Sequence, residues 1–352
     1  MNIIDLRSDT VSHPTPAMRQ AMANAVVGDD VYGEDPTANQ LEQDAADMLG
    51  FEAGLLVPSG TAGNLISLLT HCERGTEAII GDSCHIFRYE AGGIAAVAGV
   101  MPHTVPVQAD GTLDLDDIRR AVRGSNYHFP RTRLISVENT QNSAGGVALS
   151  PQYMQSVAAL AKEYGLRYHI DGARIFNAAA AYRVHVSELV KGADSVTFCL
   201  SKGLCAPAGS IIVGSKAFID EARRKRKMLG GGMRQVGVLA AAGSIALHEM
   251  SQRLHEDHAN AALLAEGISD VPHLRVLSQN TNFVFFYLDE AAPLQPEAFE
   301  AALRERGIYI SGYPGDVRRY RLVTHYWITR DRVDTVVQAM KELLTENVTQ
   351  RA

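Results

Sequence analysis

Long apolar runs, an excess of positive charge and clustered cysteines are all missing from this 352-residue chain. No stretch approaches the roughly 20 uncharged apolar residues that a membrane-spanning helix needs, so we expect no membrane partner. The formal net charge of −7 argues against a nucleic-acid partner, and the one basic run, residues 223–227, is too short to reverse it. The first residues reach an acid at Asp5 and lack the apolar core of a signal peptide.

The chain contains four cysteines, Cys72, Cys84, Cys199 and Cys205, and none of them lies in a CxxC spacing. This usage predicts that no disulfide framework forms, and with the missing signal peptide it predicts a cytoplasmic location. The histidines of residues 248–258 do not follow the HExxH spacing of a helical zinc site, so we expect no metal.

Strand-like and helix-like segments alternate through the first two thirds of the chain. This alternation predicts an α/β domain with an open, mainly parallel sheet. A turn-rich N-terminal arm over residues 1–36 precedes it, and the large domain is expected to cover residues 37–245. Its elements are a helix over 38–49, a helix over 152–163, and apolar strands at 54–57, 78–80, 133–137, 167–170, 195–200 and 210–213.

The pattern changes after a helix predicted over residues 237–258. The C-terminal segments predict a smaller α+β domain over residues 246–352, which the N-terminal arm would fold back to complete. Its elements are strands at 274–277, 282–287, 308–310 and 320–324, with helices near 296–306 and 330–344. Ligands in such folds bind beyond the carboxyl ends of the strands, and often between domains.

Lysine is scarce as well: the chain has seven, and none precedes residue 162. Lys202 is the one that directly follows a predicted buried strand, and Asp171 follows the strand at 167–170 in the same way. A lysine and a carboxylate at neighbouring strand ends suit pyridoxal phosphate, one for a Schiff base and one to keep the pyridine nitrogen protonated. From spacing alone, a lysine that caps a loop beside an unrelated aspartate is an equally good interpretation.

Other motifs have two interpretations each. Residues 58–64 join a strand to a helix, so Ser59 and Thr61 with nearby backbone N–H groups could hold a phosphate, or could simply cap the helix. Beside a Schiff-base lysine, the phosphate interpretation is favoured. His85, beyond the strand at 78–80, could stack on a cofactor ring, although a structural histidine is the simpler interpretation for it and for His128.

Several motifs occur in the order of one known family: residues 5–10, 27–36, 57–61, 85 with 88–90, 169–174, 200–204, 230–235 and 321–325. Through these motifs the sequence resembles the low-specificity L-threonine aldolases, from Asp5 essentially to its end. These are pyridoxal-phosphate enzymes of the aspartate-aminotransferase fold (fold type I). The resemblance therefore implies an α/β large domain with a mainly parallel sheet and a smaller C-terminal α+β domain.

The resemblance also implies roles at the cofactor. Lys202 would form the Schiff base with pyridoxal 5'-phosphate, and Asp171 would hold the pyridine nitrogen. Arg174 would lie near the phenolic oxygen and the substrate carboxylate, and His85 would stack on the ring. The phosphate would be held by Ser59, Gly60 and Thr61.

For the substrate, the resemblance implies that Ser8 and Arg321 bind the amino-acid carboxylate and that His128 approaches the hydroxyl. Tyr32 and Arg234 would reach the site of a neighbouring subunit, in a homotetramer with shared active sites. The chain departs from the family at Gln141, where a histidine is usual. A glutamine cannot titrate near neutral pH, so a proton-transfer role at this position is not expected.

The activity expected from these residues is cleavage of L-threonine or L-allo-threonine, and of other β-hydroxy-α-amino acids, to glycine and an aldehyde, with the reverse aldol addition. The base for the β-hydroxyl proton would be His85, or a water that His85 and His128 orient. The alternatives are a β-eliminating lyase or an aminotransferase, and, in another class, a non-catalytic protein that binds pyridoxal phosphate.

Overall fold

The computed structural model describes residues 3–345, which form two compact units. The large unit is His13–Gln252, and the small unit comprises the described parts of Met1–Ser12 and Arg253–Ala352. The predicted arm over residues 1–36 is therefore divided, since its first residues belong to the small unit and the rest to the large one. The boundary near the C-terminal domain also falls at residues 252 and 253, a few residues later than the sequence predicted.

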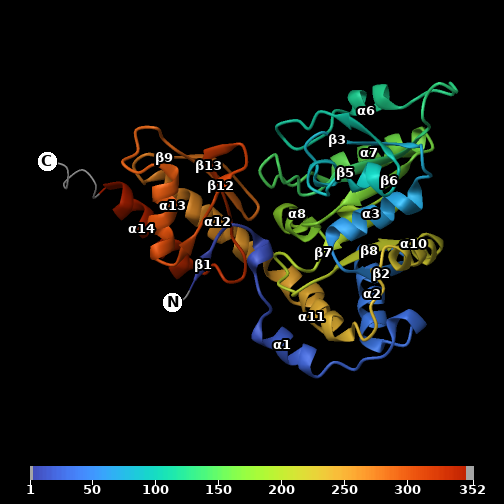
Figure 1. Cartoon of the computed structure of the whole chain (residues 1–352), viewed down its shortest axis with the longest axis horizontal. Coiled ribbons are helices and arrows are strands. Elements are labelled where there is room, and N and C mark those ends of the chain that lie inside the picture. The colour runs from blue at the N-terminus through green and yellow to red at the C-terminus, as the bar shows by residue number, and fades with distance from the viewer. Residues whose placement is uncertain (1–2, 346–352) are drawn as a thin grey trace. The chain divides into compact units, whose positions relative to one another are not determined.

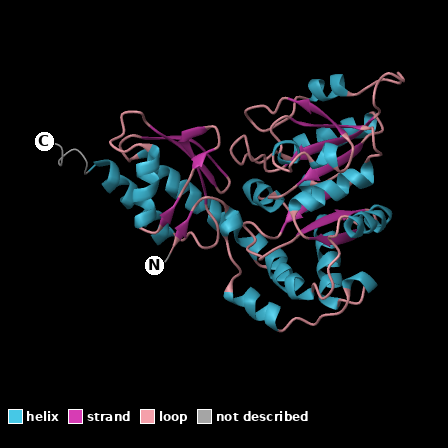
Figure 2. Cartoon of the chain, viewed as in Figure 1, coloured by secondary structure: helices cyan, strands magenta, loops and turns pink. Residues whose placement is uncertain are grey.

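A seven-stranded sheet forms the centre of the large unit, with helices packed around it (Figures 1 and 2). Its order is β2-β8-β7-β6-β5-β3-β4, and β8 runs antiparallel to both neighbours while the run from β7 to β4 is parallel. The strands are β2 (Ala53–Val57), β3 (Glu77–Gly81), β4 (Met101–Val105), β5 (Thr132–Glu138), β6 (Arg167–Asp171), β7 (Ser195–Cys199) and β8 (Ser210–Gly214). The interior strands β3, β7 and β8 are buried along their whole length, which fits their mainly apolar sequences.

Two groups of helices cover this sheet. In one group α3 and α10 contact each other, and α3 also lies against β7; in the other, α9 contacts both α2 and α7. The helices of the unit are α1 (Pro16–Ala23), α2 (Pro36–Leu49), α3 (Gly60–His71), α4 (His85–Arg88), α5 (Gly93–Ala96), α6 (Leu115–Ala121), α7 (Pro151–Glu163), α8 (Ile175–Tyr182), α9 (Val186–Leu189), α10 (Lys216–Met228) and α11 (Gly237–His248). An apolar cluster that includes Leu55, Ile66 and Ile219 fixes α3 and α10 on the sheet.

The small unit is built on an antiparallel sheet of order β12-β13-β10-β9. A separate pair forms where β1 (Ile4–Asp5) runs parallel to β11 (Ile308–Tyr309), so the N-terminal residues complete this unit. The remaining elements are β9 (Leu274–Asn280), β10 (Phe283–Leu288), β12 (Gly312–Tyr313), β13 (Asp316–Val323), α12 (Leu254–Ser269), α13 (Pro296–Glu305) and α14 (Arg330–Thr345). Its core joins Leu6 to Phe286 and Phe299.

The single helix predicted over residues 237–258 is instead two helices, α11 and α12, separated by a 3-10 turn at Met250–Arg253. The apolar pattern continues through the break, because Leu247, Met250 and Leu254 are all buried. Because the apolar periodicity does not change at this break, periodicity alone could not reveal it.

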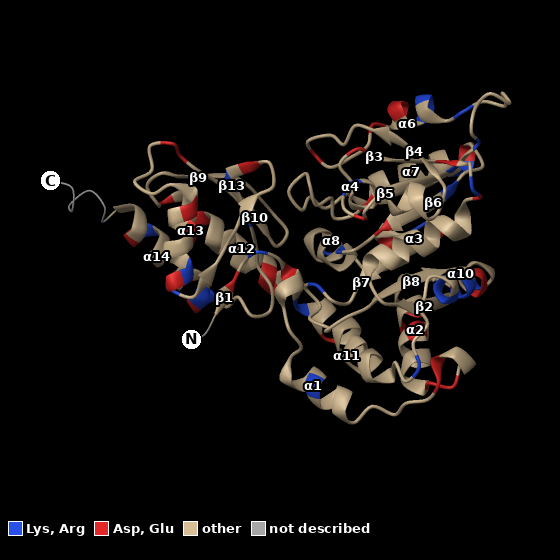
Figure 3. Ribbon diagram, viewed as in Figure 1, with Lys and Arg blue, Asp and Glu red and all other residues tan. Residues whose placement is uncertain are grey.

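The basic run of residues 223–227 lies on α10, a helix that carries both basic and acidic residues (Figure 3). Arg226 is only 3% exposed and its guanidinium binds Asp30 at 2.6 Å, while Arg223 binds Glu42 at 2.7 Å. These pairs offset the positive charge of Arg223 and Arg226 within the large unit. Among the described residues, no helix combines the length and the apolar character needed to cross a membrane.

Candidate active site

The carboxyl ends of β5, β6 and β7 place polar residues at one edge of the large sheet. Glu138 and Asp171 are register partners at the ends of β5 and β6, and Asp171 also pairs with Thr197 of β7. The half-buried Lys202 lies in the turn that follows β7, where its carbonyl accepts the N–H of Cys205. The structure thus brings Asp171 and the turn of Lys202 to the same edge, as the strand pattern predicted.

Hydrogen bonds hold the Asp171 carboxylate, which is only 2% exposed. Asn64 Nδ2 donates to Asp171 Oδ2 at 2.9 Å, and the backbone N–H of Ala173 donates to Oδ1 at 3.2 Å. Helix α3 can bring Asn64 this close because Gly63 packs directly on β7. A Cβ at Gly63 would meet Thr197 Cγ2 at 2.5 Å.

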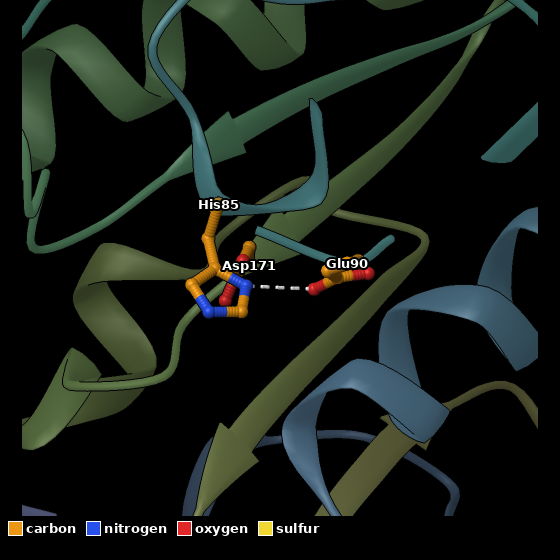
Figure 4. Close-up of side chains that lie close together, drawn as sticks. All are labelled: His85, Glu90 and Asp171. Atoms are coloured by element: carbon orange, nitrogen blue, oxygen red, sulfur yellow. Dashed lines mark hydrogen bonds and ion pairs between the residues drawn. The ribbon is translucent and has the colours of Figure 1, made fainter. Parts of the chain in front are cut away.

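His85 lies beside Asp171 and binds Glu90 (Figure 4). His85 Nδ1 and Glu90 Oε1 are 2.9 Å apart, and this hydrogen bond is the main reason why the pKa of His85 is raised. The imidazole also responds to the negative charge of Asp171 and to the positive charge of Lys202, so both groups lie within electrostatic range of His85. Burial raises the pKa of Glu90, while its hydrogen bonds to His85 and Asn64 act in the opposite direction.

Glu138 fixes the backbone around His85. Its carboxylate accepts the N–H of His85 at 2.6 Å and the N–H of Asn142 at 2.8 Å. Burial and the nearby charge of Asp171 raise the pKa of Glu138 to about 7. A buried acid therefore anchors both the start of α4 and the loop after β5.

His85, Glu90 and Asp171 offer ligand atoms within 4.8 Å of one another, a spacing that also suits a metal ion. One of these ligand atoms is already used, however, since Glu90 Oε1 accepts an N–H of Asn64 and is bound to His85 Nδ1. A metal would have to displace these donors, and for that reason we interpret the group as a hydrogen-bonded cluster.

The N-terminus of α3 lies near the same strands and fits an anion. Ser59 Oγ caps this helix by accepting the N–H of Ala62 at 3.2 Å, as the simpler interpretation of the motif predicted. Gly60 permits a close approach, because a Cβ there would lie 2.9 Å from Cys199 Sγ and 3.8 Å from Ser210 Oγ. Ser210 Oγ is buried and makes no hydrogen bond within the described residues. A buried hydroxyl beside a helix N-terminus suits a phosphate.

Three features of this edge fit pyridoxal phosphate together: Asp171 at the strand ends, the turn of Lys202, and the start of α3. The group has a ring nitrogen, an aldehyde carbon and a phosphate, and the large unit provides a carboxylate, an amine and a helix N-terminus for them. Arg174 is buried directly after β6, at the first position before α8. The arrangement can therefore hold a planar cofactor and one more anionic group.

Other predicted site residues lie elsewhere in their units. In the small unit, Arg321 Nη2 donates to the carbonyl of Arg7, the neighbour of Ser8. In the large unit, Arg234 binds Asp29 at 2.8 Å, and Tyr32 is 74% exposed. Tyr32 and Arg234 belong to one surface region, since the carbonyl of Arg234 accepts the N–H of Asp30.

The structure does not bring His128 to Asp171 within one chain. His128 lies in an exposed loop just before the amino end of β5, whereas Asp171 ends the parallel neighbour β6. Seven residues of strand, about 20 Å, separate the two edges. In its loop the His128 ring packs against Tyr127, and its N–H donates to Asn126. The role that the family resemblance implies for His128 at the substrate therefore stays a prediction, and within one chain this loop lies at the opposite edge from Asp171.

Sequence reasoning gave no role to Asn64, Glu90 or Glu138, although each is buried in the cluster. A polar residue in an otherwise apolar element was the available signal. Gln141 is also buried, and its Oε1 accepts the N–H of Ala144 at 2.7 Å while Nε2 lies 3.9 Å from Cys84 Sγ. It stabilises the loop behind His85, a role that requires no titration.

Comparisons with known proteins agree with this geometry. A family model described as "Beta-eliminating lyase" matches residues 5–291. Low-specificity L-threonine aldolase 1 of Arabidopsis thaliana is 49% identical over 98% of this chain and 97% of its own length. The low specificity L-threonine aldolase of Escherichia coli K12 is 44% identical over 97% of this chain and 99% of its own. The fold is that of a solved Leishmania major threonine aldolase, with a TM-score of 0.81, 21% identity, and coverage of 97% of this chain and 100% of the other.

Proposed function

The chain belongs to the beta-eliminating lyase family and, within it, to the low-specificity L-threonine aldolases, and we propose how its own residues divide the work of the reaction. The enzyme is an aldehyde-lyase that cleaves L-threonine to glycine and acetaldehyde. The observation that supports this most directly is His85, held by Glu90 beside Asp171 at the edge that carries Lys202. Incubation of the purified protein with L-threonine and, separately, L-allo-threonine, with acetaldehyde and glycine measured, tests the function.

Pyridoxal phosphate is the cofactor that we propose, and when bound it supplies an electron-withdrawing ring that weakens the bonds at the substrate Cα. Lys202 would hold its aldehyde carbon through Nζ, and Asp171 would accept the N–H of its ring nitrogen. The Asp171 carboxylate is already oriented by Asn64 and Ala173, so it needs no rearrangement to do this. The phosphate would be held at the start of α3 by Ser59, Gly60 and Thr61.

The substrate carboxylate requires cationic donors, for which arginine is well suited because it can bind a carboxylate through two N–H groups. We propose Arg174 for this role, and Arg321 and Ser8 stay predictions that rest on the family resemblance. Binding the carboxylate fixes the rotation about the bond from Cα to the amino group. That rotation decides which bond at Cα breaks, so these residues select cleavage between Cα and Cβ.

His85 is the proposed base for the β-hydroxyl proton. Because Nδ1 binds Glu90, we assign its proton to Nδ1, which leaves a lone pair on Nε2 in the neutral ring. Transfer of the hydroxyl proton to Nε2 lets the Cα–Cβ bond break and an aldehyde leave. The same nitrogen can return the proton in the reverse aldol addition.

The Glu90→Gln substitution should shift the acidic limb of kcat/KM for threonine to lower pH. Glu90 raises the pKa of His85, so the base becomes neutral only at a higher pH than without this partner. A glutamine can still accept the Nδ1 proton but carries no negative charge, and the imidazole then loses its proton at lower pH. Activity measured across the acidic limb checks this shift.

Glu188→Gln is the matched control, because Glu188 is an exposed acid paired with Lys191 on another face. It should leave the profile unchanged. An acidic limb that is the same in Glu90→Gln and wild type would show that His85 is not the group that limits activity at low pH.

The β-eliminating lyase remains the second candidate, because the family model that matches residues 5–291 bears that description. It would convert a cysteine-like substrate to a keto acid, ammonia and a thiol. An aminotransferase would instead pass the amino group to a keto acid. Assaying the same preparation with L-cysteine, and with a keto acid as amino acceptor, separates these activities from threonine cleavage.

Subunits are proposed to share active sites in a homotetramer. Support comes from exposed aromatic residues beside His128, since Tyr127 is 93% exposed and Phe129 is 48% exposed. Aromatic residues are enriched where proteins contact one another, so this loop is a candidate subunit contact. His128 cannot serve the Asp171 edge of its own chain, so its predicted role at the substrate requires another copy.

Mixing Arg234→Ala protein with Lys202→Ala protein should restore activity that neither has alone. If Arg234 completes a neighbour's site, each mixed pair contains one intact site, about a quarter of the wild-type total for random two-fold pairing. His128→Asn protein mixed with Lys202→Ala protein tests His128 in the same way. Subunit exchange is verified by mass spectrometry of tagged chains. No recovery despite exchange would place Arg234 in the site of its own chain and, for His128, would contradict a role at a neighbour's site.

A further inference from the structure

A continuous chain of hydrogen bonds crosses the large unit from the C-terminal end of α3 to Asp171. His71 Nε2 lies 2.7 Å from Ser195 Oγ, which lies 2.8 Å from His169 Nδ1. His169 Nε2 lies 3.2 Å from Asn64 Oδ1. Asn64 Nδ2 then donates to Asp171 Oδ2 at 2.9 Å, and to Glu90 Oε1 at 2.8 Å. We name His71, Ser195, His169 and Asn64 the relay.

The two carboxyl groups fix the direction of every bond in the relay. An amide nitrogen has two N–H groups, and these match the two acidic acceptors, whereas an amide oxygen facing both would be repelled. Asn64 Oδ1 therefore faces His169, which must donate from Nε2. The arrangement of donors and acceptors thus follows from the positions of Asp171 and Glu90.

The histidines carry this direction further. His169 is fully buried, and burial lowers its pKa to about 3, so it is neutral and its Nδ1 has a lone pair for the Ser195 hydroxyl. Ser195 Oγ then accepts the N–H of His71 Nε2; the pKa of His71 is likewise lowered to about 3 by burial. Each group in the relay donates to the next one in the direction of the carboxylates. Because all the bonds run in this direction, they polarise and strengthen one another.

We propose that Asn64 is a positioning residue for Asp171, and that His169, Ser195 and His71 hold its amide in the orientation that donates to this carboxylate. The inference rests on the proposed role of Asp171 at the ring nitrogen of pyridoxal phosphate. The relay keeps Asp171 Oδ2 in place. Without it, His169 can take its other tautomer, and its Nε2 lone pair would then face the Asn64 carbonyl oxygen.

The Ser195→Ala substitution tests the relay, with Ser67→Ala as its control. Both hydroxyls are fully buried in the large unit, but Ser67 Oγ makes no hydrogen bond within the described residues, whereas Ser195 Oγ links two histidines. The two variants remove the same group. Only Ser195→Ala interrupts the relay.

Three quantities are measured: the dissociation constant of pyridoxal phosphate, the visible absorption spectrum of the bound cofactor, and kcat and KM for threonine. Ser195→Ala should change the spectrum, weaken cofactor binding and lower kcat several-fold with little change in KM. Asn64→Ser, which removes the donor itself, should lower kcat by about ten- to a hundredfold, the usual effect of losing a hydrogen bond to a charged group. Ser67→Ala should resemble the wild type in all three.

A second pair of variants keeps the test decisive if the spectral change is small. A glutamine at position 169 can donate from its own amide without Ser195, so in the His169→Gln background Ser195→Ala should have no further effect. Equal effects of Ser195→Ala and Ser67→Ala, or a change in thermal midpoint alone, would reduce the relay to a structural feature and overturn the proposal. A further outcome is that the wild type does not cleave threonine while Ser195→Ala, unlike Ser67→Ala, still changes the spectrum of the bound cofactor. That result would refute the proposed function and support the relay.

Discussion

Lys202→Ala should abolish threonine cleavage and the visible absorbance of the bound cofactor. Lys202 lies in the turn after β7, at the edge that carries Asp171, and its charge acts on His85. Removal of a residue that forms a covalent bond during catalysis commonly costs roughly 10⁴-fold or more in kcat. Turnover measured with threonine, beside the absorption spectrum of protein incubated with pyridoxal phosphate, checks both losses.

The other lysines do not offer a substitute. They lie on helices or in surface ion pairs: Lys162 on α7, Lys191 bound to Glu188, Lys216, Lys225 and Lys227 on α10, and Lys341 on α14. Lys191→Ala is therefore a suitable control and should keep both properties. Borohydride reduction of the loaded protein followed by peptide mapping identifies the modified lysine, and a label on any lysine other than Lys202 would refute the assignment.

The edge of the sheet that carries Asp171 and Lys202 could be predicted from sequence, because it depends only on the local pattern of each strand and the residues that follow it. Asp171 and Lys202 each follow a short apolar run, and parallel strands bring such ends together whatever the rest of the chain does. The antiparallel direction of β8 did not disturb this, since it lies on the far side of β7 from β6. Local sequence was therefore sufficient to predict an α/β large domain and the common edge of the sheet at which these two residues lie.

Contacts distant in sequence could not be predicted in this way. Asn64 binds Asp171 across 107 positions, and no period or spacing connects the two. The position of His128 is a second example: the family resemblance implied its role, but only the order of loop and strand shows that it precedes the amino end of β5. The division of the N-terminal arm likewise depends on the pairing of β1 with β11, which is distant along the chain.

Asp171→Asn should lower kcat for threonine by at least about a hundredfold while pyridoxal phosphate still binds. A carboxylate near the ring nitrogen stabilises its protonated form, and a neutral amide does not. The substitution also disturbs the local hydrogen bonds. Asp171 accepts from Asn64 with one oxygen and from Ala173 with the other, and an amide offers a single acceptor. One donor must then face an NH₂ group.

Asp194→Asn is the matched control, because Asp194 accepts the N–H of Tyr168 at 2.8 Å and binds Arg167, but does so at the amino end of β6. It should have near-normal kcat. Near-normal turnover in Asp171→Asn would show that Asp171 serves only the structure of the sheet edge.

Two reactions of the same protein separate the role of Asp171 from that of His85. Threonine cleavage requires removal of the β-hydroxyl proton, whereas exchange of the glycine α-proton with solvent does not. Both reactions leave electrons at Cα, so Asp171→Asn should slow them together. His85→Asn should slow cleavage by about 10²–10⁴-fold, the usual contribution of a positioned base, and affect exchange much less. Deuterium incorporation into glycine by NMR, compared with acetaldehyde release, measures both. If His85→Asn instead lost cleavage and exchange equally, His85 would mainly hold the cofactor, and water would accept the hydroxyl proton.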